Sequence, residues 1–119
     1  MKEENLVLKK SKAFAIRTIH LYQYLMDEKK EFIMSKQVLR SRTSIGANIC
    51  EAEQAQSPSD FISKLSISLK EACESDYWLR LLHRTGYLND SEYAYIIQDC
   101  RELTRLLTSI IKSLKNKQD

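Results

Sequence analysis

Two histidines, His20 and His83, are the side chains of this sequence best suited to acid–base or metal chemistry. Neither follows a glutamate by three residues, the spacing that places metal ligands on the helices of di-iron bundles. No serine stands at a helical spacing from a histidine that could activate it, and no glycine-rich loop could hold a phosphate. We therefore expect a protein without enzymatic activity and without a metal or other cofactor.

A possible polar pair remains in the second half of the chain. Asp76 and His83 are seven residues apart and share one helical face with Leu69. The pair could line a pocket, but polar side chains on an apolar face are generally hydrogen-bonded to each other. We favour a bonded pair near one end of a helix bundle.

The cysteines do not form a recognisable reactive or metal-binding motif. Cys50, Cys73 and Cys100 are odd in number and widely separated, and none belongs to a CxxC sequence. Such a pattern is typical neither of a disulfide framework nor of a zinc site. We expect these cysteines to be small buried hydrophobic side chains.

Length and composition indicate the kind of fold that must position these residues. The chain has 119 residues, with only two glycines and one proline. All-β folds need such residues at each chain reversal, so long helices in a single domain, 1–119, are predicted. No signal peptide and no run of about 18 apolar residues is present, so we expect a cytoplasmic protein without a membrane partner.

Local signals divide the chain into helices. Ser57 and Pro58 are typical of a helix start, Gly86 of a helix end, and Asn89 with Glu92 of a capping box. Short connections favour antiparallel neighbours, so the predicted fold is all-α, an up-down-up-down antiparallel four-helix bundle. The helices are expected at about 5–30, 33–54, 58–85 and 90–115.

The second and third predicted helices each carry a polar stripe beside an apolar one. On a helical wheel the polar residues of each helix span roughly 80°. Short side chains in these stripes suit close helix approach and directional hydrogen bonds, so we favour an inter-helix network over two solvated faces. This polar seam consists of Arg40, Ser44, Asn48, Glu51, Lys64, Ser68 and Glu71.

The two central helices carry the sequence "SIGANICEA" followed by "DFISKLSISLKEACESDYWLRLL". This region resembles the small four-helix-bundle proteins encoded in 23S rRNA intervening sequences. The matching positions are Ser44, Asn48, Ile49 and Glu51 in the second helix, and Phe61, Lys64, Ser68, Leu69 and Glu71 in the third.

Three residues depart from the family pattern: Cys50 replaces an alanine, and Ala52 and Ile67 replace glycines. The resemblance implies a four-helix bundle. The relatives include accessory variability proteins of diversity-generating retroelements, which assemble as pentameric barrels, bind nucleic acid and partner a reverse transcriptase. The resemblance therefore also implies a homo-oligomer, possible RNA or DNA binding and a nucleic-acid-processing partner protein.

The net charge of +3, from 19 basic and 16 acidic residues, matters less than where the basic residues fall. Antiparallel helices bring both chain ends to the same end of the bundle. Basic patches repeated around an oligomer could follow a phosphate backbone, although the same residues could serve only solubility and helix ends. The candidates are Lys9, Lys10, Lys12, Lys112, Lys115 and Lys117 at one end, and Arg40, Arg42, Arg80 and Arg84 toward the other.

A second apolar stripe on the third helix predicts a subunit interface. It lies about 150° from the core stripe and contains the only tryptophan of the chain. Aromatic residues are enriched at buried contacts between subunits, although the first helix or the chain ends could cover the stripe instead. The predicted interface consists of Ile67, Tyr77, Trp78 and Leu81.

These observations favour a non-enzymatic, homo-oligomeric accessory factor that binds nucleic acid. The alternative is a protein-interaction module without a nucleic-acid role. The suggested number of five subunits rests on the family resemblance alone.

Overall fold

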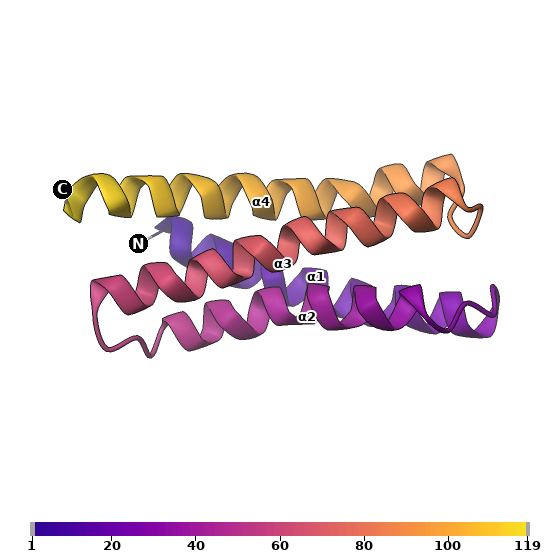
Figure 1. The fold of residues 1–119 in the computed structure, drawn as a ribbon, viewed down its shortest axis with the longest axis horizontal. Helices are drawn as coiled ribbons and strands as arrows, with labels where there is room; N and C mark the ends of the chain where they lie inside the picture. The colour runs from indigo at the N-terminus through magenta and orange to yellow at the C-terminus, as the bar shows by residue number, and fades with distance from the viewer. Residues whose placement is uncertain (1, 119) are drawn as a thin grey trace.

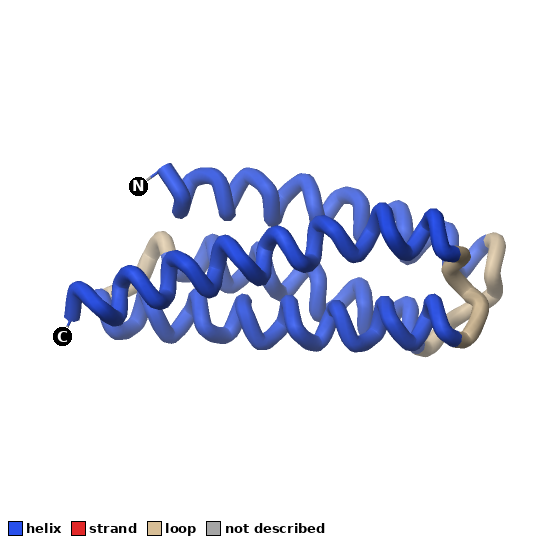
Figure 2. Tube along the Cα trace, turned by 90° about the horizontal axis from the view of Figure 1, so that it is seen from above, coloured by secondary structure: helices blue, strands red, loops and turns tan. Residues whose placement is uncertain are grey.

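The computed structural model describes residues 2–118, which form four antiparallel α-helices in up-down-up-down order (Figure 1). They are α1 (Lys2–Asp27), α2 (Met34–Ala52), α3 (Pro58–Arg84) and α4 (Asp90–Gln118). The bundle is elongated, with extents of 48 × 22 × 20 Å, and its helices run side by side with loops only at the two ends (Figure 2). The predicted all-α four-helix fold is confirmed. Within the described residues, no helix is long and apolar enough to cross a lipid bilayer.

Side-chain caps account for the limits of α3 and α4. At the start of α3, the Ser57 hydroxyl accepts a hydrogen bond from the Asp60 backbone N–H at 3.0 Å. In the next connection, Gly86 adopts a φ of 88°, which an L side chain rarely tolerates. Asn89 and Glu92 then cap α4 reciprocally, each side chain accepting from the other's backbone N–H at 2.8 and 2.9 Å.

The connection between α1 and α2 differs from the expected helix ends. α1 ends at Asp27 rather than at Lys30, and Lys30 has a positive φ of 54°. Glu31 caps α2: its carboxylate accepts from three successive backbone N–H groups, the closest that of Ser35 at 2.7 Å. A carboxylate is favourable at the N-terminal end of a helix because it satisfies unpaired N–H groups and faces the positive end of the helix dipole.

The interior is lined by one apolar face from each helix. The residues of α1 that face the core, which include Phe14 and Leu25, are almost fully buried. Cys100 is also buried, and its thiol contacts the backbone carbonyl of Ala72 at 3.1 Å. The burial predicted for Cys50 and Cys73 is wrong, because both lie on outer faces of their helices and are exposed.

Buried hydroxyl groups bring α2 and α3 close together. The Ser75 hydroxyl hydrogen-bonds the Ser41 hydroxyl at 2.9 Å, and the Ser68 hydroxyl donates to the backbone carbonyl of Ile45 at 2.9 Å. Side chains this small allow the two backbones to approach, and their hydrogen bonds offset the burial of the polar atoms. α2 and α3 are the most closely packed pair in the bundle, whereas α1 and α4 pack least closely.

Candidate functional site

Five of the predicted phosphate-binding lysines are exposed, and three of them belong to the end of the bundle where both chain termini lie (Figure 1). Lys112, Lys115 and Lys117 extend from the last turns of α4. Lys9 and Lys12 flank Lys10, which pairs with Glu102 near the middle of α4, so the prediction that all five gather at one end is wrong. Among the side chains described, those of residues 6–117, none of the five lies within ion-pair distance of a carboxylate. Within residues 6–117, these five charges are therefore not neutralised by an ion pair.

Three other predicted phosphate-binding residues have a partner within the chain, including Arg40 with Glu71 and Glu74. Lys10 pairs with Glu102 of α4 at 2.6 Å, and Arg80 pairs with Asp76 one helical turn before it at 2.8 Å. Arg84 is exposed at the opposite end of the bundle from the chain termini. The predicted basic residues thus do not form one continuous surface.

The charged part of the polar seam lies at the surface between α2 and α3. Arg40 is exposed and contacts Glu71 at 3.3 Å and also Glu74, while Lys64 lies 3.6 Å from Glu51. The Glu51 side chain is 61% exposed, so solvent weakens that pair. The charged residues of the seam therefore join the two helices without forming a buried network.

The short residues of the seam have different surroundings. Ser68 is fully buried and bonds across to α2, whereas Asn48 donates within its own helix to the Ser44 carbonyl at 2.9 Å. The residues that hydrogen-bond across the buried α2–α3 contact are therefore Ser68, Ser75 and Ser41. Ser41 was not among the predicted seam residues.

The predicted apolar interface on α3 is divided by the structure. Ile67 and Tyr77 are 39% and 50% exposed, as an outward face requires. Trp78 packs in part against the core, and its indole N–H donates to Glu74 at 3.3 Å. Leu81 is also half-buried. Ile67 and Tyr77 are therefore the residues of this stripe that a second subunit could reach most readily.

The predicted bond between Asp76 and His83 is wrong. His83 instead contacts Asp90 at 2.7 Å and stacks on the Tyr93 ring at a centroid distance of 4.3 Å. Asp76 faces Arg80 of its own helix at 2.8 Å. The α3–α4 turn brings Asp90 and Tyr93 next to the end of α3, which a search for pairs along a single helix could not detect.

The assignment of Arg42 to a phosphate-binding surface is also wrong. Arg42 is only 1% exposed, and its guanidinium lies over the Phe14 ring, 3.5 Å from the centroid. Arg42 precedes Ile49 by seven residues and therefore lies on the apolar face of α2. Its place on the helical wheel of α2 therefore indicates burial, whereas its place in the sequence, beside other basic residues, does not.

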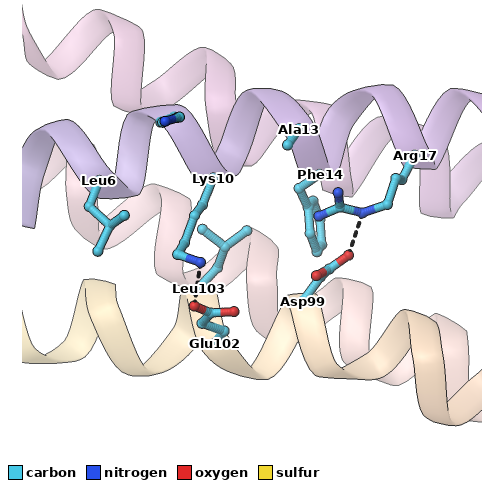
Figure 3. A pocket seen from close by; sticks show the side chains of 9 residues that line it. Leu6, Lys10, Ala13, Phe14, Arg17, Asp99, Glu102 and Leu103 are labelled. Carbon is cyan, nitrogen blue, oxygen red and sulfur yellow. Dashed lines mark hydrogen bonds and ion pairs between the residues drawn. The ribbon is translucent and has the colours of Figure 1, made fainter.

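The loose contact between α1 and α4 contains two cavities that the sequence did not predict. The first, of about 310 Å³, is crossed by two ion pairs, Lys10 with Glu102 and Arg17 with Asp99 at 2.6 Å (Figure 3). The second, of about 350 Å³, lies further along the same pair of helices. It is lined by Arg17, His20, Leu21, Tyr24, Arg42, Tyr95, Ile96 and Asp99.

Comparisons with known proteins agree with this architecture. The family described as 23S rRNA-intervening sequence protein matches residues 3–109. A crystal structure of a protein with unknown function from the S23 ribosomal protein family of Bacteroides thetaiotaomicron VPI-5482 is 58% identical in sequence, with a TM-score of 0.91. The match covers 92% of this chain and 98% of that one. No curated protein is significantly similar to this chain.

Proposed function

The chain belongs to the 23S rRNA-intervening sequence protein family, and we propose that it is a non-enzymatic, homo-oligomeric accessory factor that binds nucleic acid. The observation that carries this proposal is a group of five exposed lysines, three at the end of the bundle that holds both chain termini and two nearer its middle. We call this group, Lys9, Lys12, Lys112, Lys115 and Lys117, the terminal lysine group.

The terminal lysine group suits a phosphate backbone rather than a particular base sequence. Lysine ammonium groups act as mobile point charges, and binding to phosphates releases condensed counterions from the nucleic acid. Contacts of this kind position a protein on the backbone without reading bases. We therefore expect binding to RNA or DNA that depends steeply on salt and weakly on sequence.

Assembly would multiply these charges. Ile67 and Tyr77 are large apolar residues exposed on α3, where contact with a second subunit would cover them. If five subunits assembled, as the family resemblance suggests, the assembly would carry 5 × 3 = +15 charges. A ring of repeated lysine groups would raise the local concentration of nucleic acid, and we propose that it acts in the cytoplasm beside a nucleic-acid-processing protein.

The test measures binding of short labelled RNA and DNA strands by fluorescence anisotropy at about 50 and 200 mM salt. Changing Lys112, Lys115 and Lys117 to glutamine should weaken binding strongly and flatten the salt dependence. For single strands, each lost phosphate contact should lower the slope of log affinity against log salt by about 0.7.

The matched control changes Lys29, Lys30 and Lys36 to glutamine. These residues are exposed at the opposite end of the bundle, so the control removes the same charge from a different surface. Equal loss in the two triple variants would mean that only net charge matters, which contradicts a site at the terminal lysine group. Absence of binding at low salt would favour the alternative, a protein-interaction module that uses the exposed Ile67 and Tyr77.

The oligomeric state is tested separately by light scattering. Tyr77→Lys should dissociate the assembly, whereas Lys70→Gln, on an exposed position of the same helix, should leave it intact. Tyr77 is preferable to Trp78 as the site of change because Trp78 also packs against the core. A wild-type protein that is monomeric at micromolar concentration would contradict the proposed assembly.

A further inference from the structure

Arg42 is a buried cation without a counter-charge. Its Nε and Nη1 atoms are both buried and have no hydrogen-bond partner among the described residues. Burial lowers its pKa to about 10, so the guanidinium remains protonated at neutral pH. Stacking on Phe14 compensates part of the cost of burial but satisfies no N–H group. A charged group in this state is generally bound to an anion.

Arg42 lines the second α1–α4 cavity, whose other walls are mainly apolar and aromatic. Leu21 and Ile96 contribute aliphatic surface, and Tyr24 and Tyr95 contribute rings from opposite helices. The volume of about 350 Å³ is in the range of small-molecule sites. A largely apolar cavity with a few polar groups is typical of a site for a small ligand with a flat apolar body and a polar group.

The charges in the cavity indicate which polar group fits. Asp99 also lines it, but its carboxylate is already paired with Arg17 at 2.6 Å. Because Asp99 neutralises Arg17, the positive charge of Arg42 is left without a partner. A carboxylate would neutralise it through two parallel hydrogen bonds, whereas a phosphate dianion would leave an excess negative charge near Asp99.

From this arrangement we propose that the cavity binds a small aromatic monocarboxylate, with the carboxylate on the Arg42 guanidinium and the ring between Tyr24 and Tyr95. Because Nε and Nη1 are buried, a ligand reaches them only if the cavity wall moves aside. The wall can move at the α1–α4 contact because it is the least closely packed in the bundle. The site is independent of the terminal lysine group and does not rest on the proposed nucleic-acid binding.

The test uses 2-naphthoate as the probe and measures its binding by isothermal titration calorimetry, with ¹⁵N-labelled protein to locate it by NMR. 2-Naphthamide, which has the same ring and no charge, is the matched ligand, and inorganic phosphate is the second anion. We expect 2-naphthoate to bind at least about tenfold more tightly than either, because only it supplies both the ring and a single negative charge. Amide shifts should be concentrated around the cavity, in the C-terminal half of α1 and the N-terminal third of α4.

Two variants identify the anchor and the ring contact. Arg42→Met should lower the affinity for 2-naphthoate at least about tenfold and leave that for 2-naphthamide unchanged. Arg105→Met removes an exposed arginine of α4 and should alter neither affinity. Tyr95→Ala, at a position 65% exposed and so harmless to the fold, should weaken both naphthalene ligands.

Several results would overturn the proposal. These are no binding of 2-naphthoate at millimolar concentration, equal affinities for the acid and the amide, tighter binding of phosphate, or full affinity in a folded Arg42→Met protein. If Arg42→Met does not fold, Tyr95→Ala and the acid–amide comparison decide: unchanged affinity in Tyr95→Ala contradicts the site.

Discussion

Replacing Arg42 by methionine should stabilise the protein, although it removes a large buried side chain. Methionine retains much of the unbranched volume and carries no charge to desolvate. Burial lowers the pKa of Arg42 well below its ordinary value, to about 10, which at 1.36 kcal/mol for each pKa unit corresponds to about 3 kcal/mol of lost stability. Against this stands the lost contact with Phe14, worth about 0.5–2 kcal/mol. The expected net gain is about 1–3 kcal/mol.

The sign follows from the protonation states. Below pH 10 the guanidinium is protonated in both the folded and the unfolded chain, so the folded state bears the full cost of the buried charge. Between pH 10 and 12.5 only the folded chain releases the proton, and the cost declines as the pH rises. A measurement at pH 7 therefore records the whole effect.

The assay is urea unfolding followed by circular dichroism. The free energies of unfolding of the wild type and Arg42→Met are compared with the same slope against urea concentration for both proteins. Arg42→Ala is the control for volume: it removes the same charge but leaves a cavity, so it should be less stable than Arg42→Met. A loss of more than about 1 kcal/mol in Arg42→Met would refute the reasoning, because it would mean that the guanidinium has hydrogen-bond partners such as ordered water. Added 2-naphthoate should raise the stability of the wild type more than that of Arg42→Met, whose affinity for the ligand is lower.

Three further predictions concern the packing. Burial raises the pKa of Cys100 to about 12. A thiol reagent at pH 8 should therefore label the two exposed cysteines and reach Cys100 only after unfolding. Rapid labelling of all three cysteines under native conditions would contradict the burial of Cys100. Ser75→Val should cost about 2 kcal/mol in urea unfolding, because the larger side chain crowds Ser41 and breaks their hydrogen bond, while Ser63→Val on the exposed face should stay within about 0.5 kcal/mol. Glu51→Ala should cost less than about 1 kcal/mol by the same assay, since its ion pair is solvated; a cost of about 2–4 kcal/mol would restore the buried network that the polar stripes suggested.

The helices and their order could be predicted from the sequence because the signals are local. The cap at Ser57, the turn at Gly86 and the capping box at Asn89 each depend on residues within one turn of the chain. Apolar periodicity then defines which face of each helix is buried, and short connections leave antiparallel packing as the natural arrangement. The limit between α1 and α2 was predicted less accurately, because α1 already ends at Asp27 and Glu31 caps α2.

The sequence by itself therefore determined an all-α bundle and the exposure of its terminal lysines, while the tertiary structure alone decided what lies between the helices. Whether Ser41 meets Ser75, 34 residues away, depends on the distance and rotation between α2 and α3. The same holds for the looseness of the α1–α4 contact, which leaves two cavities and a buried Arg42 without a counter-charge. These properties arise from pairs of surfaces, and a periodic pattern along one helix contains no information about the helix opposite it.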